Sequence, residues 1–334
     1  GDRIAFVPPP AISASRITID PPAYANGVVE RRTADLGDGT DERATLRDPA
    51  LVGSMATLEL VMNESLGSDA ALAMDRMVRT DPTTAASMQL TIDEAHPERW
   101  SLRWRVAATA ALGLALEDRH GITGPEEISF RIEASEDKPP TCAVLAPAVD
   151  ESVLPTALVP VQIEGRDDVG LTNFGLTVTR REGGKGEPQP FGDTVTASSG
   201  TLQRRDEPLD LASLSVSPGD VLTIVAAAED GFELDGQRHA RVTSQPRTLR
   251  IISETDLGKQ IRGQLSAIRR AAIRLDEQQG ELLAATQNGR FDPALERGQA
   301  QMSERLRVAS ESLADLARRV GRNRLADEEL KATL

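Results

Sequence analysis

Apolar and polar side chains alternate along short segments of residues 16–252, the pattern of strands with one buried and one solvated face. In the clearest segment, Trp100, Leu102, Trp104 and Val106 alternate with polar residues. The same pattern predicts strands at residues 57–62, 88–92, 128–132, 159–163, 174–178 and 221–225. Residues 69–79 fit either a capped helix or a strand, and both alternatives stay open.

Turn sequences separate the predicted strands. They are Asn26-Gly27, Gly37-Asp38-Gly39, Gly183-Gly184, Pro218-Gly219-Asp220 and Asp235-Gly236. Short strands with turns at this spacing are typical of antiparallel β-sandwiches. Residues 183–186 (Gly-Gly-Lys-Gly) lack the spacing of a phosphate-binding loop, so we expect them at a hairpin tip.

Residues 114–132 and 225–251 share one layout: an apolar strand, a Glu-Asp pair, a glycine-bearing turn, a proline and a closing strand. Their pairs, Glu117-Asp118 and Glu229-Asp230, lie 112 positions apart, about the length of a β-sandwich domain. The sequence therefore predicts an extended arm at residues 1–15 and two tandem immunoglobulin-like β-sandwiches at residues 16–136 and 137–252. Paired prolines near the boundary, at residues 135–141, favour a stiff connection.

From residue 253 the apolar period becomes that of heptad helices. The first run is Leu257, Ile261, Leu265, Ile268, Ala272, Leu275, Gln279 and Leu282, and the second is Leu295, Gln299, Met302, Leu306, Ala309, Leu313, Leu316 and Val320. Gly289 suits the end of the first helix, Asp292 the cap of the second and Pro293 its first position. The short connection predicts an antiparallel two-helix coiled-coil hairpin at residues 253–334, so the fold class is mainly β with α.

Folding the hairpin about Gly289 predicts its register. Gln279 then faces Gln299, Leu275 faces Met302, Ala272 faces Leu306, Ile268 faces Ala309, Leu265 faces Leu313 and Ile261 approaches Leu316. The glutamines either form a polar layer that fixes the alignment or lean into solvent. Two helices cannot bury all their apolar surface, so we expect packing on the second sandwich, on another copy or on a partner. The candidate interaction residues are Leu265, Leu275, Met302, Leu306, Leu313 and Leu316.

Composition excludes several classes of protein. The 334 residues are 39% hydrophobic and only 3% aromatic, and the net charge of −14 disfavours nucleic acid as a partner. One cysteine excludes an intramolecular disulfide and a cysteine-based zinc cluster. The longest apolar stretch, residues 106–116, is too short to span a bilayer. Because the sequence lacks both an initial methionine and a secretory signal, we expect a portion of a longer protein.

Candidate chemistry is sparse. His96, His120 and His239 lack metal-ligand spacing and are expected on the surface, and no nucleophile, base and orienting group can be traced as a set, so we do not expect an enzyme. Acidic turns at sandwich ends offer hard oxygen ligands, and the calcium candidates are Asp118, Asp167, Asp168 and Asp230. The alternative is that these side chains cap turns and hold solvent. No other cofactor is expected.

Arginines gather at the end of the second predicted helix, at Arg318, Arg319, Arg322 and Arg324. They either meet anionic lipid or an acidic partner, or are simply solvated cations that the helix dipole favours at a C-terminus. The charge is also unevenly divided: residues 254–334 carry 14 basic and 13 acidic side chains, whereas residues 1–253 carry 24 and 39.

Several motifs resemble one family. They are Asp137-Lys138-Pro139-Pro140 followed by residues 144–147 (VLAP), residues 161–171 (VQIEGRDDVGL), residues 218–222 (PGDVL) leading to 226–230 (AAAED), and residues 252–257 (ISETDL). Over residues 16–290 the chain resembles large uncharacterised bacterial envelope proteins with N-terminal transmembrane helices, tandem immunoglobulin-like domains and coiled-coil segments. The resemblance implies a periplasmic or extracytoplasmic location and membrane tethering through segments absent from this sequence.

The sequence therefore predicts a non-enzymatic structural or protein-interaction module of a bacterial cell-envelope protein or assembly. Its expected partners are other proteins or a second copy, bound through the helical hairpin, and not nucleic acid. The alternative is an extracytoplasmic ligand-binding or adhesin module that uses the acidic loops, with calcium.

Overall fold

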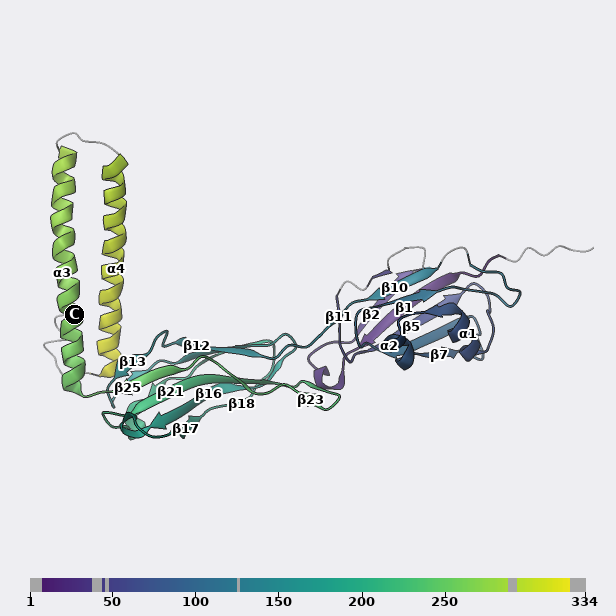
Figure 1. Cartoon of the computed structure of the whole chain (residues 1–334), viewed down its shortest axis with the longest axis horizontal. Coiled ribbons are helices and arrows are strands. Elements are labelled where there is room, and N and C mark those ends of the chain that lie inside the picture. The colour runs from purple at the N-terminus through teal and green to yellow at the C-terminus, as the bar shows by residue number, and fades with distance from the viewer. Residues whose placement is uncertain (1–7, 38–43, 46–47, 125–126, 288–292, 325–334) are drawn as a thin grey trace, which may run out of the picture.

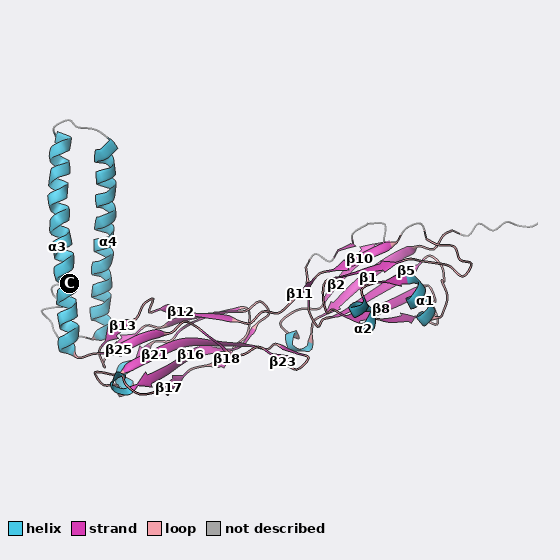
Figure 2. Cartoon of the chain, in the orientation of Figure 1, coloured by secondary structure: helices cyan, strands magenta, loops and turns pink. Residues whose placement is uncertain are grey.

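The computed structural model describes residues 8–37, 44–45, 48–124, 127–287 and 293–324, which are mainly β with a C-terminal pair of helices (Figures 1 and 2). Two β-rich parts follow one another along the long axis, and the helices project to one side at the end of the second part (Figure 1). Residues 8–136 are called the first β region below, and residues 137–252 the second β region.

Two larger sheets form the first β region. One is antiparallel, with the strand order β2 (Arg32–Gly37), β1 (Ile12–Asp20), β5 (Met55–Met62), β8 (Arg99–Arg105) and β7 (Gln89–Ile92). The other has the order β3 (Ala44–Thr45), β10 (Ile128–Ile132), β9 (Ala110–Leu114) and β6 (Val78–Arg79). A short parallel pair, β4 (Ala50–Leu51) with β11 (Ala134–Ser135), lies at the end that leads to the second region (Figure 1).

The predicted alternation is confirmed in β8. Trp100, Leu102 and Trp104 are buried, whereas Arg99 and Arg103 are exposed. The three apolar side chains belong to one hydrophobic cluster with inward residues of both sheets. Burying each side chain of this size contributes about 1.5 to 3 kcal/mol, so the alternation itself holds the two sheets together.

Residues 69–79 contain both of the elements that the sequence left open. The helix α1 (Ala70–Met77) begins after Asp69, whose carboxylate accepts the N–H groups of Ala71 and Leu72 at 3.1 Å each. Val78 and Arg79 then form β6, which pairs with β9. The next helix, α2 (Pro82–Ser87), is capped by Asp81 in the same way.

The second β region also has two larger sheets. One has the order β12 (Thr141–Ala146), β15 (Gln162–Arg166) and β19 (Leu202–Asp206). The other has the order β13 (Glu151–Val153), β25 (Arg247–Ile251), β21 (Val221–Asp230), β16 (Leu171–Arg181) and β17 (Gln189–Asp193), with β18 (Thr196–Ala197) beside β16 and β24 (Val242–Thr243) beside β21. Two short pairs are β14 (Leu158–Val159) with β20 (Leu209–Asp210), and β22 (Glu233–Leu234) with β23 (Gln237–Arg238).

The core of this region lies between its sheets, with Phe174, Ile163 and Ile224 fully buried. The hairpin tip predicted at residues 183–186 is confirmed, because these residues connect β16 to its antiparallel neighbour β17. The single strand predicted at residues 159–163 is wrong. Pro160, which has no N–H to donate, separates β14 from β15 there.

Two long helices, α3 (Glu254–Gln287) and α4 (Pro293–Asn323), lie side by side (Figure 2). Pro293 begins α4, as predicted, whereas Gly289 and Asp292 lie outside the described residues. None of the described helices is both long and apolar enough to cross a membrane.

Candidate functional site

Loops of both β regions meet at a junction. Arg105, at the end of β8, donates to Asp235 in the β22–β23 turn across 2.7 Å. Tyr24, in the 3₁₀ turn Ala23–Ala25, packs edge to face on Phe232, with ring centroids 5.2 Å apart. The regions are therefore connected by side-chain contacts as well as by the chain between β11 and β12.

Acidic side chains gather at this junction. Asp167 and Asp168 lie in the loop between β15 and β16, and Asp137 lies in the linker between β11 and β12. One carboxylate oxygen of each lies within 4.8 Å of the others, and Asp137, Asp230 and His239 form a second group with the same limit. The four aspartates are called the junction carboxylates below. Three of the four predicted calcium candidates belong to them, and the sequence did not single out Asp137 as a ligand.

The backbone of its own loop holds Asp167. Its Oδ2 accepts the N–H groups of Val169 at 3.1 Å and of Gly170 at 2.5 Å. A Cβ at position 170 would lie 2.9 Å from the side chain of Val28 in the first β region, so only glycine allows this close approach. The other oxygen, Oδ1, is buried and has no hydrogen-bond partner among the described residues.

Asp137 is buried and lacks a hydrogen-bond partner among the described residues. The residue is 9% exposed, and neither carboxylate oxygen has a hydrogen-bond partner in the described part of the chain. Burial raises the pKa of Asp137 to about 6; the nearby Tyr24 hydroxyl opposes the shift, and the other junction carboxylates add to it. Burial also raises the pKa of Asp167. Burial disfavours an isolated charge of either sign, whereas the neighbouring carboxylates disfavour further negative charge and favour a cation among these oxygens.

His239 lies beside the junction carboxylates but is already paired. Its Nδ1 is 2.6 Å from Oδ2 of Asp230, and its ring stacks on Phe232 with centroids 4.1 Å apart. The side chain is only 16% exposed, so the prediction of a surface histidine is wrong here, whereas His96 and His120 are exposed as predicted. The sequence could not show this burial, because it arises where the β22–β23 hairpin folds the chain back onto the end of β21.

Asp118, the fourth predicted calcium candidate, belongs to neither group. It follows β9, and its Oδ1 accepts the N–H groups of His120 and Ile122 at 2.8 and 2.7 Å. Burial opposes ionisation, but these N–H groups outweigh it and lower the pKa of Asp118. Asp118 follows β9, and Asp230 is the last residue of β21. Each of these strands pairs antiparallel with a later strand, so the two aspartates occupy similar positions in different β regions. A motif repeated once per region does not reveal which copy faces the junction.

The second candidate surface is the helical pair. The start of α3 and the end of α4 pack on the second β region. The hydrophobic cluster there consists of Leu154, Leu257, Ile261, Leu316 and Val320. Asn323, the last residue of α4, is fully buried. Its Oδ1 accepts the N–H of Leu154, and its Nδ2 donates to the carbonyl of Arg319, each across 2.7 Å.

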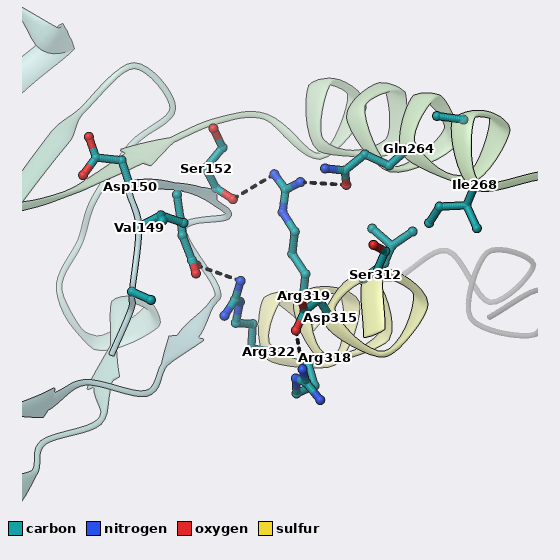
Figure 3. A pocket seen from close by; sticks show the side chains of 14 residues that line it. Val149, Asp150, Ser152, Gln264, Ile268, Ser312, Asp315, Arg318, Arg319 and Arg322 are labelled. Atoms are coloured by element: carbon teal, nitrogen blue, oxygen red, sulfur yellow. Dashed lines mark hydrogen bonds and ion pairs between the residues drawn. The ribbon is translucent and has the colours of Figure 1, made fainter. Parts of the chain in front are cut away.

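The arginine cluster completes this contact. A cleft of about 690 Å³ lies between the helices and the second β region (Figure 3). Arg319 donates to the carbonyl of Ser152 at 3.3 Å, and Arg322 pairs with Glu151 at 2.8 Å. Arg324 pairs with Asp210, and Arg318 with Asp315 of its own helix. Both sequence interpretations of the cluster are therefore wrong for Arg319 and Arg322, which bind groups of the second β region. Sequence alone does not show that the helix ends against this edge.

The predicted helical seam is only partly buried. Met302 and Leu316 of α4 and Leu275 of α3 are buried, and Leu265 is half-buried, but Leu306 and Leu313 are 48% and 41% exposed. Met302, Ala309 and Leu316 recur every seven residues, and Leu306 and Leu313 lie about 40° further round the helix. Because two helices contact each other along one narrow stripe, Met302 and Leu316 are buried there, and Leu306 and Leu313 remain exposed to solvent. On α3, Ala272 is exposed and Ala271 is half-buried, the reverse of the predicted seam.

Gln279 and Gln299 are exposed. Of the two alternatives for this pair, the solvated one is therefore confirmed.

Comparisons with known proteins give no family. No family model matches the chain, and no curated protein matches it. Similar solved structures include the MG0-NIE-MG1 domains of native alpha-2-macroglobulin from Escherichia coli, at 11% identity and a TM-score of 0.23 over 59% of this chain and 67% of that one. The Escherichia coli adhesin FdeC has 13% identity and a TM-score of 0.28 over 74% and 67%. The Yersinia pseudotuberculosis adhesin InvE has 11% and 0.24 over 60% and 56%. At these scores, the functional argument depends on the chain's own residues.

Proposed function

We propose that this chain is a non-enzymatic scaffold module in which two immunoglobulin-like β-sandwiches carry a helical hairpin that pairs with the hairpin of a second copy. The exposed apolar row on α4 is the observation that supports this pairing. Leu306 and Leu313 are 48% and 41% exposed and, seven residues apart, lie on one side of the helix. Large apolar side chains exposed side by side are typical of interaction surfaces.

The arrangement of the helices leaves this row accessible. Contacts with the second β region involve residues near the helix ends, such as Leu257 and Val320. Leu306 lies 14 residues before Val320, which is about 21 Å along the helix at 1.5 Å per residue. The helices project away from the β regions (Figure 1), so a second hairpin can lie along them and form a four-helix bundle.

Charge favours the hairpin over the β regions as the surface of self-association. With 14 basic and 13 acidic side chains, residues 254–334 are close to neutral. Residues 1–253 carry a net charge of −15, from 24 basic and 39 acidic side chains. Two copies that meet through the β regions repel each other, whereas two hairpins bring together nearly neutral surfaces.

The cellular setting is part of the same proposal. The sequence motifs that resemble bacterial envelope proteins support a periplasmic or extracytoplasmic location, and membrane tethering of the full-length protein is expected from that resemblance. A spacer of two sandwiches with a stiff linker would hold the hairpins at a set distance from the point of attachment.

Light scattering coupled to size-exclusion chromatography tests the pairing. We expect the full chain to have the mass of a dimer, and the double variant Leu306→Glu with Leu313→Glu to have that of a monomer, because each buried leucine in the interface would become a desolvated charge. A monomeric parent chain at the highest soluble concentration, or an unchanged mass for the double variant, would contradict the proposal.

Leu72→Glu is the matched control. Leu72 is also helical and 48% exposed, but it lies on α1 in the first β region. Its variant should keep the mass of the parent protein. Circular dichroism of all the variants shows whether the helices are retained, which separates loss of pairing from loss of folding.

A further inference from the structure

Three buried oxygen atoms at the junction have no hydrogen-bond partner among the described residues. They are both carboxylate oxygens of Asp137 and Oδ1 of Asp167, and each of these residues is 9% exposed. Buried carboxylates in proteins are normally paired with cations, hydrogen-bond donors or metals. Besides burial, the groups that shift the pKa of Asp137 are the Tyr24 hydroxyl and further carboxylates, none of which carries positive charge, so a cation from outside the chain would compensate these oxygens.

The oxygens lie close enough together to share one ion. Ca²⁺ binds oxygen ligands at 2.3 to 2.6 Å, so ligands of one ion lie at most about 5 Å apart. One oxygen of each of Asp137, Asp167 and Asp168 lies within 4.8 Å of the other two. Mg²⁺ demands a strict octahedron and usually keeps several of its waters, whereas Ca²⁺ accepts the irregular set of ligands that a loop and a linker provide.

The donor set also favours a hard cation. The group of Asp137, Asp167 and Asp168 offers carboxylate oxygens alone. The neighbouring group includes an imidazole, but His239 and Asp230 are bonded to each other at 2.6 Å, which leaves them less available to a metal such as zinc. Asp168 accepts the N–H of Lys138 at 3.2 Å through Oδ1, and its Oδ2 can bind the ion.

The geometry points to a calcium site at the junction between the β regions, with Asp137, Asp167 and Asp168 as its protein ligands. The ligands come from the linker and from a loop of the second region, and Gly170 of that loop touches Val28 of the first region. The bound ion therefore fixes the linker to the second region at the point where the first region rests on it. Water molecules complete the coordination, because Ca²⁺ takes six to eight oxygen ligands.

Terbium luminescence and calorimetry test the site on the full chain. Tyr24, the only tyrosine in the sequence, lies next to Asp137, and both tryptophans are buried in the core of the first region. We expect Tb³⁺ to emit on excitation of tyrosine, Ca²⁺ to displace it, and Ca²⁺ alone to give a binding heat with a Kd of about 1 mM or tighter. Tyr24→Phe should abolish the emission and keep the calcium heat.

Ligand variants decide whether the junction is the site. Asp137→Asn and Asp168→Asn should each lose both signals, whereas Asp235→Asn, at the same junction but outside both groups, should keep them. In EDTA, Asp137→Asn should melt at the same temperature as the parent chain or higher, because it removes an uncompensated buried charge, so its loss of binding is not a loss of folding.

Three results would overturn the assignment. They are the absence of a calcium heat for the parent chain at millimolar calcium, signals that survive both ligand variants, and a zinc heat that His239→Gln removes while calcium gives none.

Discussion

The carboxylate of Asp220 lies buried in the turn before β21 and is held by three donors. The N–H groups of Ser217 and Gly183 donate to it at 2.9 Å each, and Arg180 pairs with it at 2.8 Å. Burial alone would raise the pKa of Asp220, but these donors outweigh it and lower the pKa. Asp137 is also buried, but in the described part of the chain it has no backbone N–H or arginine partner, and burial raises its pKa. The neighbours of a buried aspartate thus decide whether its charge stabilises the fold.

We expect Asp220→Asn to lower the free energy of unfolding by about 2 to 3 kcal/mol at pH 7, because charge-assisted hydrogen bonds are lost and Arg180 is left unpaired. A depressed folded pKa stabilises the protein above the unfolded pKa, and that contribution is lost as pH falls through the folded pKa. The deficit should therefore shrink below about pH 4. Urea unfolding at pH 7 and at the lowest pH that keeps the protein folded measures it; a deficit independent of pH would contradict the argument.

At the scale of elements, the end of α4 depends on one amide side chain. Asn323 is fully buried and bonds both the backbone N–H of Leu154 and the carbonyl of Arg319. Arg322 and Glu151 flank this contact with an ion pair of 2.8 Å, in which both side chains are largely buried. Polar contacts therefore join the last turn of α4 to β13 and to the segment after β13.

Asn323→Ala should destabilise this docking by about 1 to 3 kcal/mol, because the N–H of Leu154 would be left buried without an acceptor. Hydrogen exchange of the Leu154 amide should quicken, and proteolysis within α4 should become faster. Gln299→Ala, an exposed change on the same helix, should alter neither measurement. Unchanged exchange at Leu154 would show that the apolar cluster alone holds the helix end.

At the scale of the molecule, two side-chain contacts at the junction link the β regions. The Arg105–Asp235 pair is 38% and 68% exposed, and solvent-exposed pairs of this kind contribute little to stability. The edge-to-face contact of Tyr24 with Phe232 adds about 0.5 to 1.5 kcal/mol beyond its buried area. Each of these two contacts is weak, and an ion bound to the linker would add to the stiffness of the junction.

Small-angle X-ray scattering tests that consequence of the proposed calcium site. We expect a narrower distribution of conformations in calcium than in EDTA, because the ion fixes the linker to the second region. The Asp137→Asn variant should scatter identically under both conditions. A calcium-dependent change that persists in this variant would place the effect elsewhere in the chain.

The sequence determined the local elements of this protein. Alternation predicted the buried face of β8, and the change of period at residue 253 marked the start of the two helices. The acidic turns predicted Asp167, Asp168 and Asp230 as candidate ligands, and the structure places all three among the junction carboxylates. Each of these signals is a periodicity or turn chemistry carried by residues close together in the chain, and such local preferences act wherever the segment packs.

The tertiary structure decided which of these residues meet. Asp137 joins the carboxylates because a linker and a loop converge, and Asp118 does not because it lies one β region away. The side of α4 that faces α3 buries Met302 but not Leu306, although both fit the heptad pattern. These outcomes depend on contacts between segments far apart in the chain. The periodicity of one segment does not determine the free energy of its packing against another.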